Sequence, residues 1–394
     1  MQDLLDVEGL VTSFPTPRGE LRAVDGLSLR LAPGEALGVV GESGSGKSVL
    51  VRTIMNLLPR NARVPPEARV RFAGRDVRAL PRAEARHFWG PQMAMVFQDP
   101  MTSLNPVRTI GRQLTEPMRY HLRLGRRAAR DRATELLTQV GIGEPERRLD
   151  QYPHELSGGM RQRVMIAIAL SCSPKLLIAD EPTTALDVTV QKEILDLLTR
   201  LRREMGMAMI LISHDLGVVS GRTDRTMVMY AGRAVEVGPT AALFARTRHP
   251  YTAALLRSMP LIDQPSHTPL EVIPGSPPDL VAPPAGCRFA PRCRNAQEGC
   301  LVAPPPLDPD PDEPRHRYAC LYPVGTERGR QALAENRARR RTGAGLDLAA
   351  VGAGAGKLRS EERGDEGGAR QPLGAASERS ERDQHSARVD EVTG

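Results

Sequence analysis

Apolar runs of four or five residues, each followed by a segment with helical spacing, organise the first 245 residues of the chain. Ala36–Val40, Leu176–Ala179 and Met209–Ile212 are short, almost wholly apolar runs. Such runs indicate strands that are buried on both faces, as in a sheet covered by helices. Residues 101–170 read as a helical stretch and contain an Arg/Ala/Leu-rich segment, Leu124–Val140, with helical spacing. The pattern predicts one α/β unit over residues 1–245, with a helical insertion over about residues 99–170.

The pattern changes after residue 245. Sixteen of the 34 prolines fall between Met259 and Pro323, together with four of the five cysteines. Proline is excluded from helix interiors and central strands, so residues 246–325 must form an extended segment without a regular core. Residues 326–394 contain no aromatic residue and no cysteine. We expect this tail to be disordered, because it has too little apolar surface to offset the entropy of ordering.

Charge and hydropathy exclude several classes of protein. The net charge is +7, but the arginines are scattered and only 3% of residues are aromatic, so no base-stacking surface for nucleic acid is predicted. No apolar run approaches the roughly 20 residues that a membrane helix requires. The first residues lack a basic stretch followed by an apolar run, so we expect no secretory signal. A cytoplasmic protein is expected, with any membrane role supplied by a partner.

A phosphate-binding loop follows the first buried strand. Residues 41–48 read GESGSGKS and fit the pattern G-x-x-x-x-G-K-[ST], between a predicted strand that ends at Val40 and a predicted helix, Val49–Leu58. The backbone N–H groups of such a loop, and the positive end of the following helix, face phosphate oxygens. The predicted ATP-binding residues of the loop are Gly41, Glu42, Ser43, Gly44, Ser45, Gly46, Lys47 and Ser48. Only four of the 54 basic residues are lysine, so chance is a poor explanation for a lysine at this position of the motif.

Two carboxylates follow the second buried strand. Asp180 and Glu181 end the run Leu176–Ala179. Adjacent residues of a strand point to opposite faces, so one carboxylate can face a metal ion and the other a water molecule. We expect Ser48 and Asp180 to serve Mg²⁺, and Glu181 to polarise the attacking water.

Residues 156–160, LSGGM, occupy a distinctive place about twenty residues before the acidic strand end. We interpret Leu156, Ser157, Gly158, Gly159 and Met160 as a nest of backbone donors at a helix start. The nest would bind the γ-phosphate of an ATP held by another chain. This interpretation makes the protein one half of a pair.

These motifs, in this order, resemble the nucleotide-binding subunit of ATP-binding cassette (ABC) transporters. The matching elements are GESGSGKS at 41–48, Gln98 in VFQDP at 96–100, LSGGM at 156–160, LLIADE at 176–181, ALD at 185–187 and SHD at 213–215. The resemblance implies a P-loop NTPase (RecA-like) core with an antiparallel β subdomain, an inserted helical signature subdomain and a small Cys/Pro-rich C-terminal segment.

The resemblance also implies roles for four further residues. Gln98 matches the Q-loop residue, which contacts Mg²⁺ or water, and His214 matches the switch histidine that holds Glu181 and the water in place. Asp187 matches the D-loop residue that meets the opposite subunit. Phe14 is expected to stack on adenine, with a core position as the alternative. Two such subunits would enclose two ATP molecules, close on binding and separate after hydrolysis.

The C-terminal part narrows the resemblance to one branch. HPYTAALL at 249–256, FQDPMTSLNP at 97–106 and YPHE at 152–155 are similar to the peptide and nickel branch of bacterial importers. The resemblance implies an ATPase that powers dipeptide or oligopeptide import from the cytoplasmic face of the inner membrane. The implied partners are two permease subunits, a second ATPase subunit in a heterodimer or a homodimer, and an external binding protein. A nickel or other small-solute importer is the alternative, and a soluble ABC ATPase acting on nucleic acid or ribosomes is a more distant one.

Four cysteines in the C-terminal segment point to a metal. Cys287, Cys293, Cys300 and Cys320 are separated by 5, 6 and 19 residues. A cytoplasmic chain is not expected to pair them as disulfides, and zinc sites usually contain closer pairs. Iron–sulfur clusters tolerate looser spacing, so a 4Fe–4S cluster is favoured over Zn²⁺, with free thiols third. The resemblance points to the cluster as well. The fifth cysteine, Cys172, is expected to be a buried small residue.

Overall fold

The computed structural model describes residues 3–99, 103–184, 186–259 and 271–348. Four of the sequence expectations fall outside these residues in part. They are the start of the helical stretch at residues 100–102, Ala185 of the ALD motif, residues 260–270 of the C-terminal segment, and the tail from residue 349 onward.

An antiparallel sheet forms the N-terminal layer. Its strands are β1 (Leu5–Thr16), β2 (Gly19–Leu31), β4 (Arg69–Phe72) and β5 (Arg75–Asp76), in the order β2-β1-β4-β5. Buried and exposed residues alternate along β2 and β4, because one face of the sheet packs on the core and the other faces solvent. Thr12 of β1 shares a buried hydrogen bond of 2.9 Å with Thr53 of the first helix. The layer is thereby fixed to the helix that follows the phosphate-binding loop.

A larger mixed sheet forms the centre of the molecule. Its strands are β3 (Ala36–Val40), β6 (Met93–Val96), β7 (Leu176–Asp180), β8 (Ala208–Ser213), β9 (Arg225–Tyr230), β10 (Arg233–Pro239), β11 (Asp308–Pro309) and β12 (Arg317–Tyr318). The order is β11-β12-β10-β9-β3-β8-β7-β6, with β9, β3, β8, β7 and β6 parallel. The three strands expected from apolar runs are present and fully buried.

Successive residues of the central strands serve two different cores. Leu37 and Val39 of β3 pack with the antiparallel sheet and the first helix, whereas Ala36 and Val40 pack with the helices on the other face. This alternation explains why the runs are apolar throughout, since both faces of the sheet are covered.

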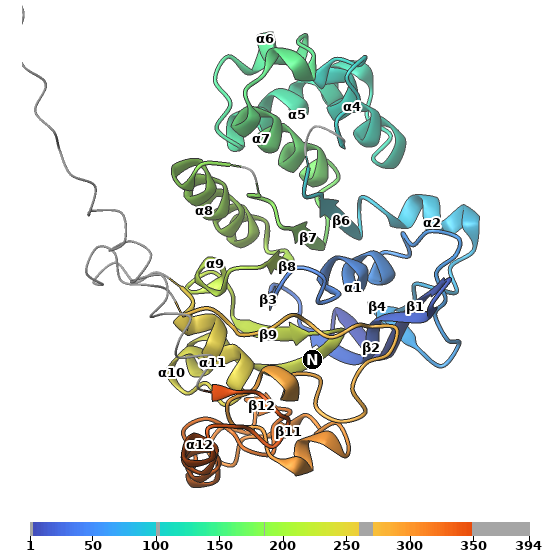
Figure 1. The fold of residues 1–394 in the computed structure, drawn as a ribbon. Helices are drawn as coiled ribbons and strands as arrows, with labels where there is room; N and C mark the ends of the chain where they lie inside the picture. The colour runs from blue at the N-terminus through green and yellow to red at the C-terminus, as the bar shows by residue number, and fades with distance from the viewer. Residues whose placement is uncertain (1–2, 100–102, 185, 260–270, 349–394) are drawn as a thin grey trace, which may run out of the picture. The chain divides into compact units, whose positions relative to one another are not determined.

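Some helices lie around the central sheet, and others form a separate group. They are α1 (Lys47–Ile54), α2 (Arg82–Phe88), α4 (Ile110–His121), α5 (Arg126–Gln139), α6 (Pro145–Leu149), α7 (Gly158–Leu170), α8 (Val188–Met205), α9 (Leu216–Val219), α10 (Thr240–Ala245), α11 (Pro250–Arg257) and α12 (Glu327–Arg339). Helices α4 to α7 gather beyond β6, away from the antiparallel sheet (Figure 1). The expected α/β core with an antiparallel subdomain and an inserted helical subdomain is confirmed. No helix within the described ranges is long and apolar enough to cross a membrane.

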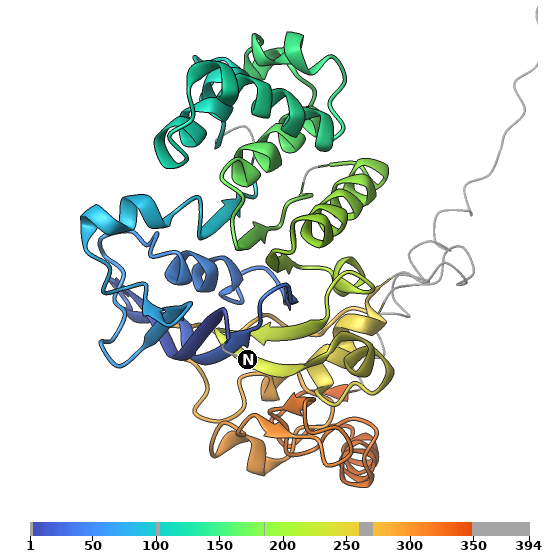
Figure 2. The ribbon, with the colours of Figure 1, turned by 180° about the vertical axis from the view of Figure 1, so that it is seen from behind.

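The segment after residue 245 packs against the edge of the central sheet. Strand β12 pairs with β10, so β11 and β12 extend the sheet, and the 3₁₀ turns Ala290–Arg292 and Glu298–Leu301 lie beside them. Figure 2 shows this segment and α12 at the end of the structure opposite α4 to α7. Glu236 of β10 is fully buried beneath the segment. It accepts hydrogen bonds from the backbone N–H groups of Arg248 and His249, and it contacts Nε2 of His316 at 2.8 Å.

The expectation of disorder immediately after Gly325 is wrong for residues 326–348. Thr326 caps helix α12, and Ala332 and Asn336 are buried. The Asn336 side chain donates hydrogen bonds to the carbonyl oxygens of Arg294 and Ala296. The prediction was based on the low apolar content of the tail. Polar side chains, however, attach this helix to the rest of the protein as much as apolar ones do.

The buried His249 makes stability depend on pH. Burial lowers the pKa of His249 to about 4, although Glu236 opposes the shift. Its Nδ1 accepts the backbone N–H of Tyr251 at 3.1 Å and caps α11. Because the unfolded chain takes up this proton near pH 6.5, the contribution of His249 is complete above that pH. It is lost progressively as the pH falls toward 4.

We therefore expect His249→Asn to flatten the acid side of the stability profile. Asparagine can still cap the helix, but it does not titrate. Between about pH 7.5 and about pH 5.5 the unmodified protein should lose roughly 1 kcal/mol more unfolding free energy than the variant. Urea unfolding at the two pH values measures this difference, and equal losses in both proteins would contradict the assignment.

Candidate functional site

The phosphate-binding loop connects β3 to α1, and two of its glycines have no room for a side chain. A Cβ atom on Gly41 would lie 2.1 Å from the carbonyl oxygen of Met229, and one on Gly46 would lie 2.2 Å from that of Ala23. Gly46 also adopts a φ of +100° as it caps α1, a conformation that suits glycine alone. The loop therefore lies close against β2 and β9.

Lys47 is buried at the start of α1 and directs its ammonium group back into the loop. Nζ donates to the carbonyl oxygens of Gly41 at 2.7 Å and Glu42 at 3.0 Å. It also lies 3.7 Å from a carboxylate oxygen of Glu181. Burial lowers the pKa of Lys47, and the charges of Glu181 and Asp180 oppose this shift. The cation is thus held where the loop curls, as the motif predicts.

The two carboxylates after β7 face different partners. The Ser48 hydroxyl donates to Oδ1 of Asp180 at 2.9 Å, so the two oxygen groups expected to serve Mg²⁺ are in contact. Glu181 Oε2 lies 3.1 Å from Nδ1 of His214 and accepts the Thr184 hydroxyl at 3.1 Å. Burial raises the pKa of Asp180, with partial compensation by the Ser48 hydrogen bond.

The structure brings five of the predicted residues into one connected cluster. They are Lys47, Ser48, Asp180, Glu181 and His214. Oxygen ligands of this kind suit Mg²⁺, and a carboxylate held by an imidazole and a hydroxyl is suited to orient a water molecule. The site can therefore bind the phosphates of a nucleotide and direct water at them.

Two predicted residues are not joined to this cluster. Gln98 is exposed in the bend after β6, and Phe14 is half-buried in β1. Among the described residues, neither side chain has a hydrogen bond or ring contact to the loop or to Asp180. To act at the site, each residue must therefore be reached by the bound nucleotide or brought to it by a movement of the helical group.

The LSGGM signature forms the exposed start of α7. Ser157 caps the helix by accepting the backbone N–H of Met160 at 3.3 Å, and Leu156 is buried beneath it. Gly159 packs closely on Val190 of α8, whose N-terminal cap is the exposed Asp187. Both predicted contact points for a second chain therefore lie together at exposed helix N-termini.

One residue that sequence reasoning missed connects the signature helix to the carboxylate edge. Gln162 of α7 is 1% exposed, and its side-chain amide donates to the carbonyl oxygen of Pro182 at 2.5 Å. Pro182 follows Glu181 directly. No sequence signal marks this residue, because Gln162 stands between Arg161 and Arg163, just before the apolar run of residues 164–170.

The four cysteines of the C-terminal segment line one pocket. Its remaining walls include His249, Phe289 and Tyr322. Burial raises the pKa of each of the four thiols. Across the described ranges, however, no group of three or more His, Cys, Asp or Glu side chains is arranged to hold a metal ion.

Backbone groups surround the sulfurs of this pocket. Backbone groups two positions later, those of Phe289, Asn295 and Tyr322, partly oppose the rise in the pKa of Cys287, Cys293 and Cys320. Hydrogen bonds to sulfur stabilise thiolates and tune bound clusters. The donor set is therefore of the right chemical kind for a thiolate metal site, although its spacing is not that of a formed one.

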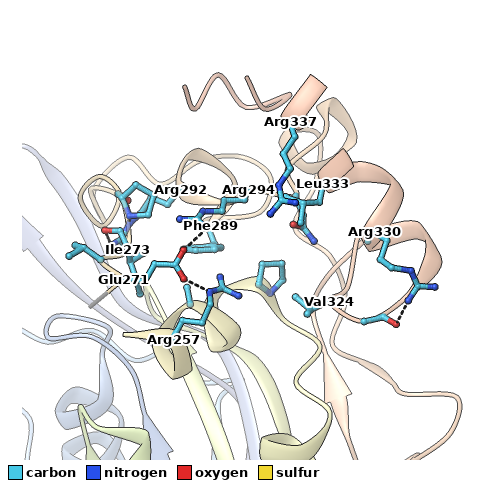
Figure 3. Close-up of a pocket in the computed structure, with 17 residues that line it drawn as sticks. Arg257, Glu271, Ile273, Phe289, Arg292, Arg294, Val324, Arg330, Leu333 and Arg337 are labelled. Atoms are coloured by element: carbon cyan, nitrogen blue, oxygen red, sulfur yellow. Dashed lines mark hydrogen bonds and ion pairs between the residues drawn. The ribbon is translucent and has the colours of Figure 1, made fainter. Parts of the chain in front are cut away.

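A second pocket in the C-terminal segment is strongly basic. Figure 3 shows Arg292 and Arg294 on one side and Arg330 and Arg337 of α12 on the other. Glu271 bridges Arg257 at 2.6 Å and Arg294 at 2.5 Å, and among the described residues it is the one acidic residue in the lining. Arg292 differs from the other arginines here, because it reaches out of the pocket to the phosphate-binding loop.

Comparisons with known proteins agree with this geometry. Residues 24–184 match the family model described as ABC transporter, and residues 235–300 match the one described as oligopeptide/dipeptide transporter, C-terminal region. A protein of Brucella abortus (strain 2308), named "Putative peptide import ATP-binding protein", is 50% identical over 78% of this chain and 94% of its own length. Another protein of that strain with the same descriptive name is 53% identical over 77% of this chain and 91% of its own.

Solved structures give the same result for the fold. The dimeric post-hydrolysis state of the ATP-binding cassette MJ0796, bound to ADP and Pi, matches with a TM-score of 0.54 and 27% identity. The match covers 60% of this chain and 98% of that one. CbiO1 from Clostridium perfringens, part of the ABC transporter complex cbiONQ, matches with a TM-score of 0.53 and 29% identity, over 62% and 92% of the two chains.

We expect Lys47→Met to weaken ATP binding. The variant loses a cation whose charge-assisted hydrogen bonds to phosphate are worth roughly 1.5–3 kcal/mol, so the Kd for ATP should rise about 10- to 100-fold. Titration with a fluorescent ATP analogue measures this. Lys175→Met, which removes an exposed lysine before β7, serves as the control and should bind as the unmodified protein does. Equal affinities in all three proteins would exclude Lys47 from the site.

Proposed function

Because the chain belongs to the family of ABC transporter ATP-binding proteins, we propose that it hydrolyses ATP to power import of dipeptides or oligopeptides. The observation that carries the cargo class is the match of residues 235–300 to the C-terminal region of oligopeptide/dipeptide transporters. The printed names of the Brucella relatives support it, since they match over more than three quarters of this chain.

We propose the following division of work within the site. Lys47 and the backbone of the loop hold the β- and γ-phosphates, while Ser48, Asp180 and Gln98 serve Mg²⁺, which when bound screens the charge on the phosphates. Glu181 accepts a proton from the attacking water. The 3.1 Å contacts of Glu181 with His214 and Thr184 support this role, since they fix the direction of its carboxylate.

The remaining contacts to ATP are proposed to come from β1 and from a second chain. Phe14 stacks on adenine. Residues 156–160 and Asp187 meet the ATP held by a second ATPase subunit, and the exposed N-terminus of α7 supports this, because helix starts bind anions. The competent set of residues in this chain means that it also offers a site of its own. The second subunit is a different chain, with a second copy of this chain as the alternative.

The proposed assembly places the protein at the cytoplasmic face of the inner membrane. Two permease subunits hold it there, and an extracytoplasmic binding protein delivers peptide to them. The helical group α4 to α7 is the proposed contact with the permeases. Gln162 supports this, since it joins α7 to the backbone next to Glu181, and a movement at the nucleotide is thereby passed to the group.

We also propose that the four cysteines hold a metal group, a 4Fe–4S cluster in preference to Zn²⁺. Their shared pocket and the backbone groups that favour their thiolates support this proposal. Binding would release the thiol protons. Its contribution would be to tie together a proline-rich segment that has no regular core.

Glu181→Gln tests the importer and its catalytic base together. The amide keeps the shape of the side chain but cannot accept the proton, so phosphate release should fall roughly 10²- to 10⁴-fold while ATP still binds. In cells that carry the variant in place of the natural gene, uptake of labelled dipeptide should fall to background.

Two results separate the alternatives. Glu204→Gln, on the exposed face of α8 and paired with Arg200, should leave both hydrolysis and uptake unchanged. Loss of hydrolysis with unchanged peptide uptake would overturn the peptide cargo. A parallel loss of nickel uptake would then assign the importer to nickel.

The metal proposal is tested by anaerobic purification and elemental analysis. A cluster predicts a brown protein with about four irons and four sulfides per chain, lost in Cys300→Ser and kept in Cys172→Ser, whose cysteine lies elsewhere. A colourless protein with one zinc would replace the cluster by the zinc site. The absence of both metals, with four thiols that react after unfolding, would leave the cysteines as free thiols.

A further inference from the structure

The phosphate-binding loop is held from outside the cassette by residues of the C-terminal segment. Glu42, the second residue of the loop, donates its backbone N–H to the hydroxyl of Tyr251 at 2.8 Å, across 209 positions of sequence. Its carboxylate accepts hydrogen bonds from both terminal nitrogens of Arg292, at 2.7 and 3.0 Å, across 250 positions. The family pattern of the loop leaves this position free, so nothing in the motif itself requires the contacts.

Arg292 is fixed in place before it reaches Glu42. It is 5% exposed, its Nε donates to the carbonyl oxygen of Pro274 at 2.8 Å, and Nη1 also donates to the Tyr230 hydroxyl at 3.2 Å. Figure 3 shows it beside Ile273 at one wall of the basic pocket. A guanidinium held on several sides loses little entropy when it binds a carboxylate with two parallel hydrogen bonds.

Three packed aromatic rings support the contacts of Arg292 and Tyr251 with Glu42. The rings of Tyr230, Tyr251 and Phe289 lie 4.5 to 5.3 Å apart in all three pairs, and Tyr230 and Tyr251 are fully buried. They come from β9, from α11 and from the cysteine-rich segment. The two groups that hold Glu42 thus belong to one packed cluster.

A second arginine of the same segment supports the far side of the loop. Arg288 donates to Asp25 and to the carbonyl oxygen of Ala231. The neighbouring Gly232 donates its N–H to the carbonyl oxygen of Ser45 at 2.9 Å, and accepts the N–H of Asp25 at 2.9 Å. Residues 288–292 therefore support the loop near both of its ends.

The charge of Glu42 gives this support a consequence for ATP. Its carboxylate sits in the loop that must receive the phosphates of ATP, and an unpaired negative charge there opposes their binding. Arg292 neutralises that charge. We propose that Arg292 is a positioning residue of the ATP site, and that the C-terminal segment, through Arg292 and Tyr251, sets the affinity of the loop for ATP. This inference rests on the proposed role of residues 41–48 in ATP binding.

The test is a double-variant cycle on the affinity for ATP in the full chain. Arg292→Gln leaves the Glu42 carboxylate unpaired, so the Kd for a fluorescent ATP analogue should rise about tenfold. This is the size of effect expected when one pair of opposite charges near the phosphates is broken. Glu42→Gln should stay within about threefold of the unmodified protein, because the variant removes the charge that Arg292 neutralises. The double variant should return to that range, since no carboxylate is then left unpaired.

Two further variants separate positioning from general damage. Arg294→Gln, in the same segment but paired with Glu271, should leave the Kd for ATP unchanged. Tyr251→Phe keeps the packed ring and loses the acceptor for the Glu42 N–H, so its Kd should rise a few-fold while the melting temperature falls by only a few degrees, as for one lost hydrogen bond.

Each outcome decides the proposal. A normal Kd in Arg292→Gln overturns it, and so does a double variant as weak as Arg292→Gln, because the effect would then not pass through Glu42. Recovery in the double variant supports it. Lys47→Met is measured alongside. If that variant also binds ATP normally, the role of the loop itself fails, whereas a weak Lys47→Met with a normal Arg292→Gln refutes this inference alone.

Discussion

The register of β8 between β3 and β7 is the constraint on which the nucleotide site depends. Val40 at the end of β3 lies opposite Ser213, and Asp180 at the end of β7 lies opposite Ile212. Because the three strands are parallel and end at the same level, the chain leaves all of them at one edge of the sheet. The phosphate-binding loop, Glu181 and His214 are therefore brought together by strand pairing alone, before any side chain makes a contact.

The chain has two surfaces that differ in how their residues are held. The cluster around Lys47 and Glu181 is held by internal contacts, whereas the starts of α7 and α8 present Ser157 and Asp187 to solvent. A helix start carries unsatisfied N–H groups that favour an anion. In the solved dimeric cassette that this chain resembles, two such chains are found together. Gln162 makes the two surfaces interdependent, since it attaches α7 to the strand end that carries Glu181.

The sequence was sufficient for the features whose cause is local. The loop, the buried strands and the carboxylates follow from short patterns, because each is set by neighbouring residues and by the period of a strand. The contacts of Glu42 with Tyr251 and Arg292 could not be predicted, since they join residues more than 200 positions apart and no local pattern marks them. The helix α12 was missed for another reason. Its docking depends on the amide of Asn336 as well as on the buried Ala332.

The position of the cysteines relates the C-terminal segment to the phosphate-binding loop. Arg288 follows Cys287 directly, and Arg292 precedes Cys293, so each arginine that supports the phosphate-binding loop adjoins a thiol that lines the shared pocket. A packed interior transmits small displacements, because side chains that are close-packed cannot move independently. The stretch of backbone that places these two thiols in the pocket therefore also places the two arginines beside the loop. The cysteine-rich segment and the ATP site are in this sense one structural unit, although residues 42 and 292 are separated by most of the described chain.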